Sequence, residues 1–284
     1  MANHTYRPPD PDHMVETDLG PIAVQDPHRG RGGLALVLWP SIFTDRHIYD
    51  AILPHLSDDL RVICVDGPGH GQSLGVARPF SMGDCAASLA QVLDACGLTR
   101  AIVGGTSWGG LVAAEFGLRH PDRAAAVLML NTPLGIGNDG PRALTRFIAF
   151  GARWLTGFRF FRDGISKAFF LPETLPAAPV YHDQFHAMLR RAPGAALGAA
   201  VRSVLLHTDP LAPRLGGLAP PALILAGERD TGYPAAEAQV AAQALPRGQF
   251  RALPTSHISV VDAPEATAQV IRDFLAETGL TPAG

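Results

Sequence analysis

Short apolar runs alternate along the chain with segments in which apolar residues recur at helical spacing. Mainly apolar runs are typical of strands covered on both faces, and they occur at residues 34–39, 61–65, 101–105, 127–130 and 222–226. Residues 249–253, which include Gln249 and Arg251, are predicted to form a sixth strand. Helical spacing is found at residues 46–56, 81–96, 111–119, 235–245 and 265–277. Strands that alternate with helices indicate an α/β fold, a mostly parallel twisted sheet with helices on both faces. Residues 14–27 are predicted to form a hairpin ahead of it.

Residues 134–219 break this alternation. They contain no buried-strand pattern and are rich in Ala, Pro, Arg and Phe. A structureless loop of that length is implausible in a compact domain, so we predict a helical cap inserted into the core. The predicted division is a flexible tail at residues 1–13, a core at 14–133 and 220–284, and the cap at 134–219.

The cap offers two interpretations of its aromatic and basic residues. One helical stripe holds Leu144, Phe147, Ile148, Gly151 and Leu155, and residues 142–167 contain six cationic side chains but one acid, Asp163. The first interpretation is an aromatic lid over an apolar pocket, with a cation for a substrate carboxylate. The second, which we favour, is a cap that packs its aromatics on the sheet and solvates its arginines.

Composition narrows the class of protein. The net charge is −3, which argues against a nucleic-acid partner because such proteins carry a basic footprint. Three cysteines give no disulfide framework and favour a reducing compartment. The first thirteen residues lack the apolar core of a secretory signal, and no apolar run reaches the length of a membrane span. We therefore expect a cytoplasmic protein with no membrane partner.

A short motif, Gly105-Thr106-Ser107-Trp108-Gly109, lies between an apolar strand and a helix. In that context G-x-S-x-G predicts a sharp, strained turn that exposes the serine hydroxyl at the carboxyl edge of the sheet. The amino terminus of the following helix favours developing negative charge there. Ser107 is the candidate nucleophile. The alternative is an ordinary strand-to-helix turn that binds a phosphate.

A nucleophilic serine needs a histidine base, and the histidine needs a carboxylate that orients it. Asp230 follows the fifth strand, and His257 follows the sixth. Ser107, Asp230 and His257 therefore reach one edge of the sheet in the chain order of α/β-hydrolases. The alternatives are that Asp230 caps the next helix, that Glu228 is the acid, or that His257 is a surface histidine.

With these residues in place, the chain resembles the α/β-hydrolase superfamily over nearly all of residues 20–278. Four blocks carry the resemblance: residues 66–73 (DGPGHGQS), the Ser107 turn, residues 227–230 with Pro234, and residues 256–257 with Pro264 and Glu265. The resemblance implies the α/β-hydrolase fold with its helical cap. The proposed chemistry requires neither a metal nor an organic cofactor.

The oxyanion hole is the least regular part of the pattern. Trp39 and Pro40 stand where many members of the superfamily carry His-Gly. In that register the backbone N–H of Ser41 is one donor and that of Trp108, after the nucleophile, is the other. Pro40 has no N–H, and the register can slip to Ile42.

Two narrower resemblances bear on the reaction. Replacement of His-Gly, with the same spacing to Tyr49, is similar to β-ketoadipate enol-lactone hydrolases and implies lactones or small esters. Trp108 after the nucleophile is similar to haloalkane dehalogenases and epoxide hydrolases, whose nucleophile is an aspartate. Because this chain has Ser107 at that position, we expect an acyl-enzyme intermediate.

The predicted function is hydrolysis of a carboxylic ester or lactone with a small apolar or aromatic substrate, one that can carry a carboxylate. Two alternatives stay open, a carbon–carbon hydrolase acting on a β-diketone and a non-catalytic binder of small ligands. Candidate pocket walls, with core packing as the alternative, are Trp39, Ile42, Phe43, Phe147 and Trp154. The sequence does not give an oligomeric state.

Overall fold

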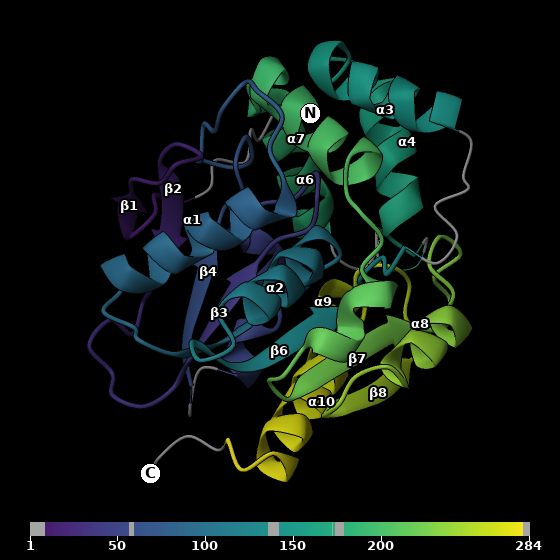
Figure 1. The fold of residues 1–284 in the computed structure, drawn as a ribbon. Coiled ribbons are helices and arrows are strands. Elements are labelled where there is room, and N and C mark those ends of the chain that lie inside the picture. Colours follow the sequence, from purple (N-terminus) through teal and green to yellow (C-terminus); the bar gives the residue numbers. More distant parts are fainter. Residues whose placement is uncertain (1–8, 57–59, 136–141, 172, 174–178, 281–284) are drawn as a thin grey trace.

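The computed structural model describes residues 9–56, 60–135, 142–171, 173 and 179–280. Their centre is an eight-stranded sheet with the order β1-β2-β4-β3-β5-β6-β7-β8 (Figure 1). The strands are β1 (His13–Val15), β2 (Ile22–Gln25), β3 (Ala35–Trp39), β4 (Arg61–Val65), β5 (Ala101–Thr106), β6 (Ala124–Leu130), β7 (Ala222–Gly227) and β8 (Gly248–Leu253). Strands β3 to β8 are parallel, and the β1–β2 hairpin adds to β4 in the antiparallel direction. The predicted fold class and strands are confirmed.

The parallel strands end in register, which brings the turns that follow them to one edge. Trp39 pairs with Gly105, Thr106 with Leu130, and Gly227 with Leu253. Strands β3 to β7 are buried along their whole length, because helices cover both faces of the sheet.

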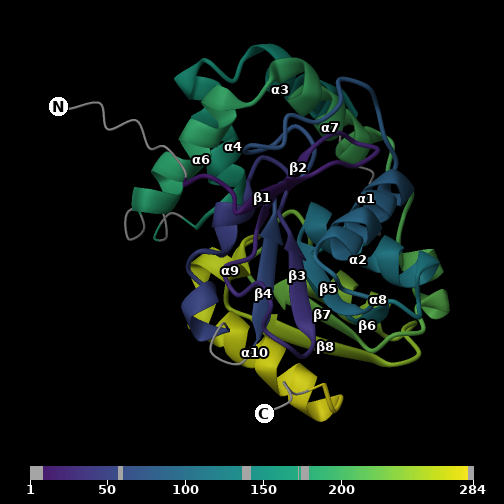
Figure 2. The ribbon, with the colours of Figure 1, turned by 90° about the vertical axis from the view of Figure 1, so that its left-hand side faces the viewer.

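Helices α1 (Met82–Ala95), α2 (Trp108–Arg119) and α8 (Ala235–Ala242) lie on one face, and α10 (Pro264–Glu277) lies on the other (Figure 2). The short α9 (Ser259–Asp262) precedes α10. Local sequence explains where α1 begins: Ser81 accepts the N–H of Asp84, whose carboxylate accepts the N–H of Ser81, a reciprocal capping box. None of the helices in the described ranges is both long and apolar enough to cross a membrane.

The insertion is helical, as predicted. Its helices are α3 (Arg142–Trp154), α4 (Arg159–Phe169), α6 (Pro179–Arg191) and α7 (Gly194–Leu206), followed by the 3₁₀ turn η3 (Ala212–Gly217). They form a layer beyond the carboxyl edge of the sheet (Figure 1). Helices α3 and α7 pack closely because Gly194 and Gly198 leave room for the backbone of α3.

Several predicted elements differ in their bounds. The helix expected at 46–56 is two 3₁₀ turns, η1 (Arg46–Tyr49) and η2 (Leu53–His55), since Pro54 provides no N–H for a continuous α-helix. The helix expected from Leu111 begins at Trp108, because Gly109 and Gly110 are helical rather than part of the turn. Of the predicted tail, residues 1–8 lie outside the described part. Asp12 is bound to the sheet: its N–H donates to the Val24 carbonyl of β2, and its carboxylate accepts the N–H of Asp26.

Candidate active site

Ser107 occupies a strained turn between β5 and α2. Its backbone has φ 55° and ψ −110°, a region that residues with side chains seldom adopt. Ser107 is the N-cap residue of α2, yet its hydroxyl makes no capping bond within the described residues. The backbone N–H donates to the Leu130 carbonyl at 2.8 Å, which fixes the turn to β6. The strain therefore holds a serine side chain that helix capping does not use.

The glycines of the motif have a steric cause. A Cβ atom at Gly105 or Gly109 would collide with the carbonyl oxygen of Trp39, and one at Gly110 would collide with Thr132. The last residue of β3 thus lies against both glycines that flank the Thr106-Ser107-Trp108 segment. The pattern G-x-S-x-G is required here by the close approach of neighbouring strands.

Asp230 and His257 form a buried pair. His257 Nδ1 lies 2.7 Å from Asp230 Oδ2, and the two residues are only 6% and 8% exposed. The other carboxylate oxygen, Oδ1, accepts the backbone N–H groups of Gly232 and Tyr233 at 2.9 and 3.1 Å. These bonds fix the carboxylate, which in turn can orient the imidazole.

The alternatives for these two residues can be compared with the structure. The N-cap of α8 is Pro234 rather than Asp230, so Asp230 does not cap that helix. Glu228 is exposed, and His257 is enclosed rather than on the surface. The geometry pairs His257 with Asp230, the residue that the sequence predicts.

Two polar residues that the sequence analysis missed hold the His257 loop. Asn131, at φ 48° just after β6, donates to the Ser256 carbonyl at 3.1 Å and accepts the Ser259 hydroxyl at 2.7 Å. Asp262 accepts the N–H of Ser256 at 2.8 Å and also its hydroxyl. Asn131 is itself tied to β7, because its N–H donates to the Leu225 carbonyl. The His257 loop is therefore connected through Asn131 to β6 and β7, the strands next to Ser107 and Asp230.

The loop after β3 contains the predicted oxyanion donors. The Phe43 N–H donates to His70 Nε2 at 3.1 Å, and the Thr44 N–H donates to the Ser41 carbonyl. The N–H groups of Ser41 and Ile42 make no hydrogen bond with a described residue. The hydroxyl of Ser41 is also enclosed without a partner in the described ranges. Free donors are thus available at both predicted positions, and Phe43 is excluded because its N–H is used.

His70 explains the shape of that loop. Its Nδ1–H donates to the Pro68 carbonyl at 3.0 Å, which leaves Nε2 to accept the Phe43 N–H. Burial lowers the pKa of His70 to about 4, so the imidazole stays neutral and keeps its acceptor. Phe43 is held at φ 65°.

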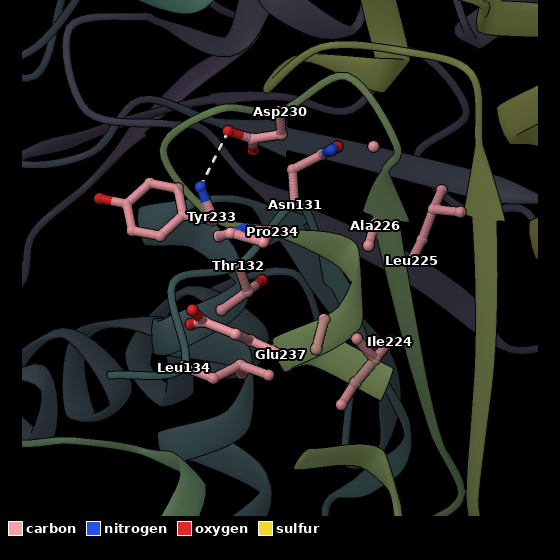
Figure 3. A pocket seen from close by; sticks show the side chains of 12 residues that line it. Asn131, Thr132, Leu134, Ile224, Leu225, Ala226, Asp230, Tyr233, Pro234 and Glu237 are labelled. Carbon is pink, nitrogen blue, oxygen red and sulfur yellow. Dashed lines mark hydrogen bonds between the residues drawn. The ribbon is translucent and has the colours of Figure 1, made fainter. Parts of the chain in front are cut away.

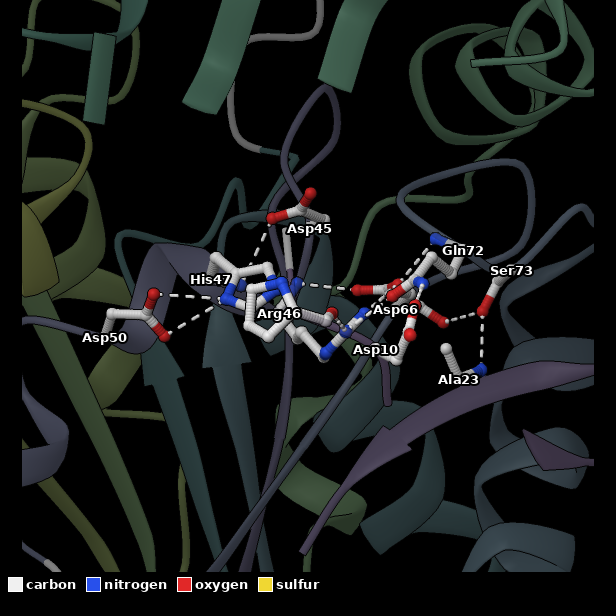
Figure 4. Close-up of polar contacts among 10 residues, drawn as sticks. Asp10, Ala23, Asp45, Arg46, His47, Asp50, Asp66, Gln72 and Ser73 are labelled. Atoms are coloured by element: carbon white, nitrogen blue, oxygen red, sulfur yellow. Dashed lines mark hydrogen bonds and ion pairs between the residues drawn. The ribbon is translucent and has the colours of Figure 1, made fainter. Parts of the chain in front are cut away.

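A second anchor of the loop is the ion pair of Arg46 with Asp66, shown in Figure 4. Asp66 accepts the Arg46 N–H at 2.8 Å, the Arg46 guanidinium at 2.7 Å and the Gln72 N–H at 2.7 Å. A Cβ atom at Gly71 would collide with the same carboxylate. The block 66–73 therefore supports the loop that carries the predicted oxyanion donors, and its role is structural.

Tyr49 joins the loop to β5, the strand that ends just before Ser107. Its hydroxyl donates to the Trp39 carbonyl and accepts the Thr106 N–H at 3.0 Å. Burial raises its pKa well above the ordinary value, so the hydroxyl keeps its proton. Tyr49 thereby fixes the end of β3 relative to the residue just before Ser107.

Aromatic rings surround the His257 imidazole. Phe169, from the end of α4, meets it edge-on with ring centroids 5.4 Å apart, and Tyr233 lies at 5.0 Å. Phe169 also contacts Phe43 at 6.1 Å. Of the predicted pocket residues, the structure therefore brings Phe43 to this cluster, and buried Ile42 precedes it.

The other pocket candidates lie elsewhere. The Trp39 ring is 1% exposed and packs edge-on against Trp108, with centroids 5.6 Å apart. Both rings press on Gly67, where a Cβ would collide with Trp108. Phe147 and Trp154 are exposed on α3. The structure does not bring these last two to His257.

Two small cavities adjoin the site, each of about 20 Å³, enough for one water molecule. The first lies beside Asp230 and is lined by Asn131, Thr132, Tyr233 and residues of β7 and α8 (Figure 3). The second lies between the loop after β3 and α6, and Asp45 lines it. Burial and the nearby Asp66 raise the pKa of Asp45 to about 6.

The cap holds a cluster with metal-ligand chemistry, Asp163, His182 and His186, whose ligand atoms lie within 4.8 Å of one another. Arg162 Nε donates to His186 Nδ1 at 3.2 Å, which leaves the imidazole proton on Nε2, the atom that faces Asp163 at 3.5 Å. A metal would have to displace that proton beside a guanidinium. We interpret the cluster as a polar contact between α4 and α6.

The fold and the arrangement of residues at its carboxyl edge define a hydrolase of the α/β class. A family model for the alpha/beta hydrolase fold matches residues 35–264, and the chain belongs to this family. The predicted superfamily is thereby confirmed, and the protein is an enzyme, a hydrolase.

Individual relatives share about a quarter of their residues with this chain. The 3-oxoadipate enol-lactonase 2 of Acinetobacter baylyi is 25% identical over 233 residues, which cover 82% of this chain and 85% of that protein. A pimeloyl-[acyl-carrier protein] methyl ester esterase of Xanthomonas campestris pv. campestris is 28% identical over 254 residues, covering 86% and 96%. The crystal structure of the enol-lactonase from Burkholderia xenovorans LB400 has a TM-score of 0.83 at 23% identity and covers 93% of this chain and 100% of that one. The predicted resemblance to enol-lactone hydrolases is confirmed.

Proposed function

We propose that the protein hydrolyses a small carboxylic ester or lactone with Ser107 as nucleophile, His257 as base and Asp230 as the residue that orients His257. The observation that carries the proposal is the pairing of a strained serine turn, whose hydroxyl does not cap its helix, with a buried aspartate–histidine pair at the same sheet edge. The names of the two relatives, an enol-lactonase and a methyl ester esterase, support this class of substrate.

The proposed reaction begins when His257 removes the proton of the Ser107 hydroxyl as its oxygen attacks the acyl carbon. Asp230 stabilises the imidazolium that forms. The tetrahedral oxyanion binds the free N–H groups of Trp108 and of Ser41 or Ile42, with the unpartnered Ser41 hydroxyl nearby. His257 then gives its proton to the leaving alcohol oxygen, and water releases the acyl group by the same steps.

The aromatic cluster around His257 indicates where the substrate enters. Phe43, Phe169 and Tyr233 border the imidazole, so the acyl or alcohol group lies against apolar rings. Phe169 belongs to the cap and Phe43 to the core. We expect the substrate to enter between them and to displace the Phe169 ring.

A covalent test separates this proposal from its alternatives. Incubation with a fluorophosphonate should add one label, which peptide mass spectrometry should place on Ser107. The wild type should hydrolyse short-chain aryl esters or lactones, and Ser107→Ala should not. A label on another residue, or turnover by the variant, would contradict the nucleophile.

The reaction class needs its own comparison. A panel of aryl esters, lactones and β-diketones, each measured with wild type and Ser107→Ala, tests the carbon–carbon alternative. Serine-dependent turnover of diketones alone would replace the ester proposal. A failure to turn over any substrate or to accept the label would favour a binding protein.

A further inference from the structure

The outer face of the cap carries a concentration of exposed apolar side chains. Among the described residues eleven large apolar side chains are exposed, and six of them fall between residues 144 and 160. They are 51–63% exposed: Leu144, Phe147, Phe150, Trp154, Phe158 and Phe160. Exposed apolar groups scattered singly need no explanation, but a contiguous set marks a contact surface.

Helix α3 buries small residues and exposes large aromatic ones, the reverse of an ordinary amphipathic helix. Its buried positions are the small residues Ala149, Gly151 and Ala152, while Phe147, Phe150 and Trp154 face solvent. Figures 1 and 2 both place α3 on the outer side of the cap, away from the sheet. The large side chains therefore do not serve the packing of the enzyme's own core.

Basic side chains border this apolar face. A groove of about 340 Å³ between α3 and α7 is lined by Arg146, Phe150, Arg153, Trp154, Arg202 and their neighbours. The Arg153 guanidinium lies 5.0 Å from the Trp154 ring centroid. Arg202 Nε is enclosed without a hydrogen-bond partner in the described part of the chain. The groove thus offers cationic donors next to aromatic rings.

Acidic groups do not balance these cations. Residues 142–167 hold six cationic side chains and one acid, Asp163, and that carboxylate lies 3.3 Å from Arg159. Of these cations Arg146 and Arg153 line the groove, where Arg202 of α7 adds a third positive charge. A partner for this surface must supply both negative charge and an apolar layer.

We propose that the outer face of α3 and the start of α4 bind the surface of an anionic lipid bilayer. An in-plane helix with aromatic residues on its exposed face and arginines at its margin suits that boundary, because rings enter the acyl layer while guanidinium groups bind phosphates. A second copy of the chain would oppose arginines to arginines. The expectation of no membrane partner rested on the lack of a spanning run, which peripheral binding does not need.

Trp154 provides a direct readout, because the other two tryptophans, Trp39 and Trp108, are at most 1% exposed. Titration of the full chain with phosphatidylglycerol vesicles should shift its fluorescence to shorter wavelength. Vesicles of phosphatidylcholine alone should give no shift, and 0.5 M salt should weaken the response. A shift that is absent with anionic vesicles, or equal with both kinds, would overturn the proposal.

Co-sedimentation of variants with the same vesicles tests which surface of the protein binds the lipid. The double variants Phe147→Ser/Trp154→Ser and Arg146→Gln/Arg153→Gln should each bind at least tenfold more weakly than wild type. Leu74→Ser and Val240→Ser remove equally exposed apolar groups elsewhere and should bind as wild type does. Equal loss in these controls would overturn the assignment, as would a vesicle-independent dimer that the Phe147/Trp154 variant abolishes. Neither measurement depends on the proposed hydrolysis.

Discussion

The carboxyl edge of the sheet and the outer face of the cap are built in opposite ways. At the sheet edge, polar groups such as Asp66, Asp230 and Asn131 are buried, and each makes several hydrogen bonds to backbone. On the cap, large aromatic groups are exposed and small residues are buried. The difference shows that precise positioning is confined to the edge, whereas the cap face is free to meet something outside the molecule.

The largest effect should come from Ser107→Ala. If the edge is a catalytic site, kcat should fall by at least about 100,000-fold, because removal of the serine from a Ser-His-Asp unit disables the whole unit. Steady-state hydrolysis of an aryl ester measures it. The melting temperature should change little, and a variant that loses its fold would not count as support.

Asp230→Asn should lower kcat by about 1,000- to 10,000-fold, because an amide cannot stabilise the imidazolium or keep its tautomer. The pH profile of kcat/KM should change together with the rate. Glu228→Gln is the matched control, since Glu228 is the exposed neighbouring acid. A larger loss with Glu228→Gln than with Asp230→Asn would reverse the assignment.

Gly109→Ala tests the steric argument for the serine turn. The new Cβ would press on the Trp39 carbonyl oxygen, so the free energy of unfolding should fall by about 3 kcal/mol, as for other overpacked sites. Gly164→Ala in α4 is the control, because no described atom lies within 4 Å of its Cβ position. It should raise the free energy of unfolding by roughly 0.5–1 kcal/mol. Urea titration compares the two.

His70 should make stability depend on pH. Burial lowers its pKa from 6.5 to about 4 in the folded chain, so the unfolded chain binds the proton more strongly. Its contribution to stability is complete above about pH 6.5 and is lost as the pH falls toward 4, by up to about 3 kcal/mol. His70→Gln should flatten this slope in urea titrations at pH 7, 5.5 and 4.5.

Other groups also titrate in this pH range, and two of them have large shifts. Burial also lowers the pKa of His186 to about 4, whereas Asp45, raised to about 6, acts in the opposite direction. The difference between wild type and His70→Gln isolates the one imidazole. Identical slopes in the two proteins would show that His70 does not titrate on unfolding.

The smallest effect is expected on the cap. Phe147→Ser with Trp154→Ser should change the free energy of unfolding by less than about 0.5 kcal/mol per site, as for ordinary surface positions. Thermal melting and urea titration both measure it. A loss of several kcal/mol would show that these rings stabilise the fold, and the contrast between the two regions would disappear.

The prediction of the sheet and the choice of the three candidate site residues have a common reason. Each of Ser107, Asp230 and His257 follows an apolar strand, and parallel strands bring such positions together. The sequence could not predict Asn131 or Asp262 as supports of the His257 loop. The partner of Asn131, Ser256, lies 125 residues away, and an asparagine after a strand resembles any turn residue.

The sequence also could not predict which aromatic side chains of the cap are buried and which are exposed. The helical periodicity placed Leu144 and Phe147 on one apolar stripe, but periodicity alone does not determine whether that stripe faces the core or the solvent. The favoured interpretation, aromatics packed inward, is right for Phe161 and Phe170 and wrong for Phe158 and Phe160. The orientation of α3 is determined by its close packing against α7 at Gly194 and Gly198.

The carbonyl oxygen of Trp39 has a consequence for how this site can vary. Gly105, Gly109 and Tyr49 all meet that one main-chain atom, and every residue type carries it. The serine turn therefore contacts the main chain at position 39 rather than its side chain, so a tryptophan can stand where His-Gly is common. Its ring packs against Trp108 and close to Gly67, and Trp108 in turn contacts His70 and Phe80. A substitution of the side chain at position 39 should therefore alter this aromatic packing while the backbone of the serine turn keeps its contact.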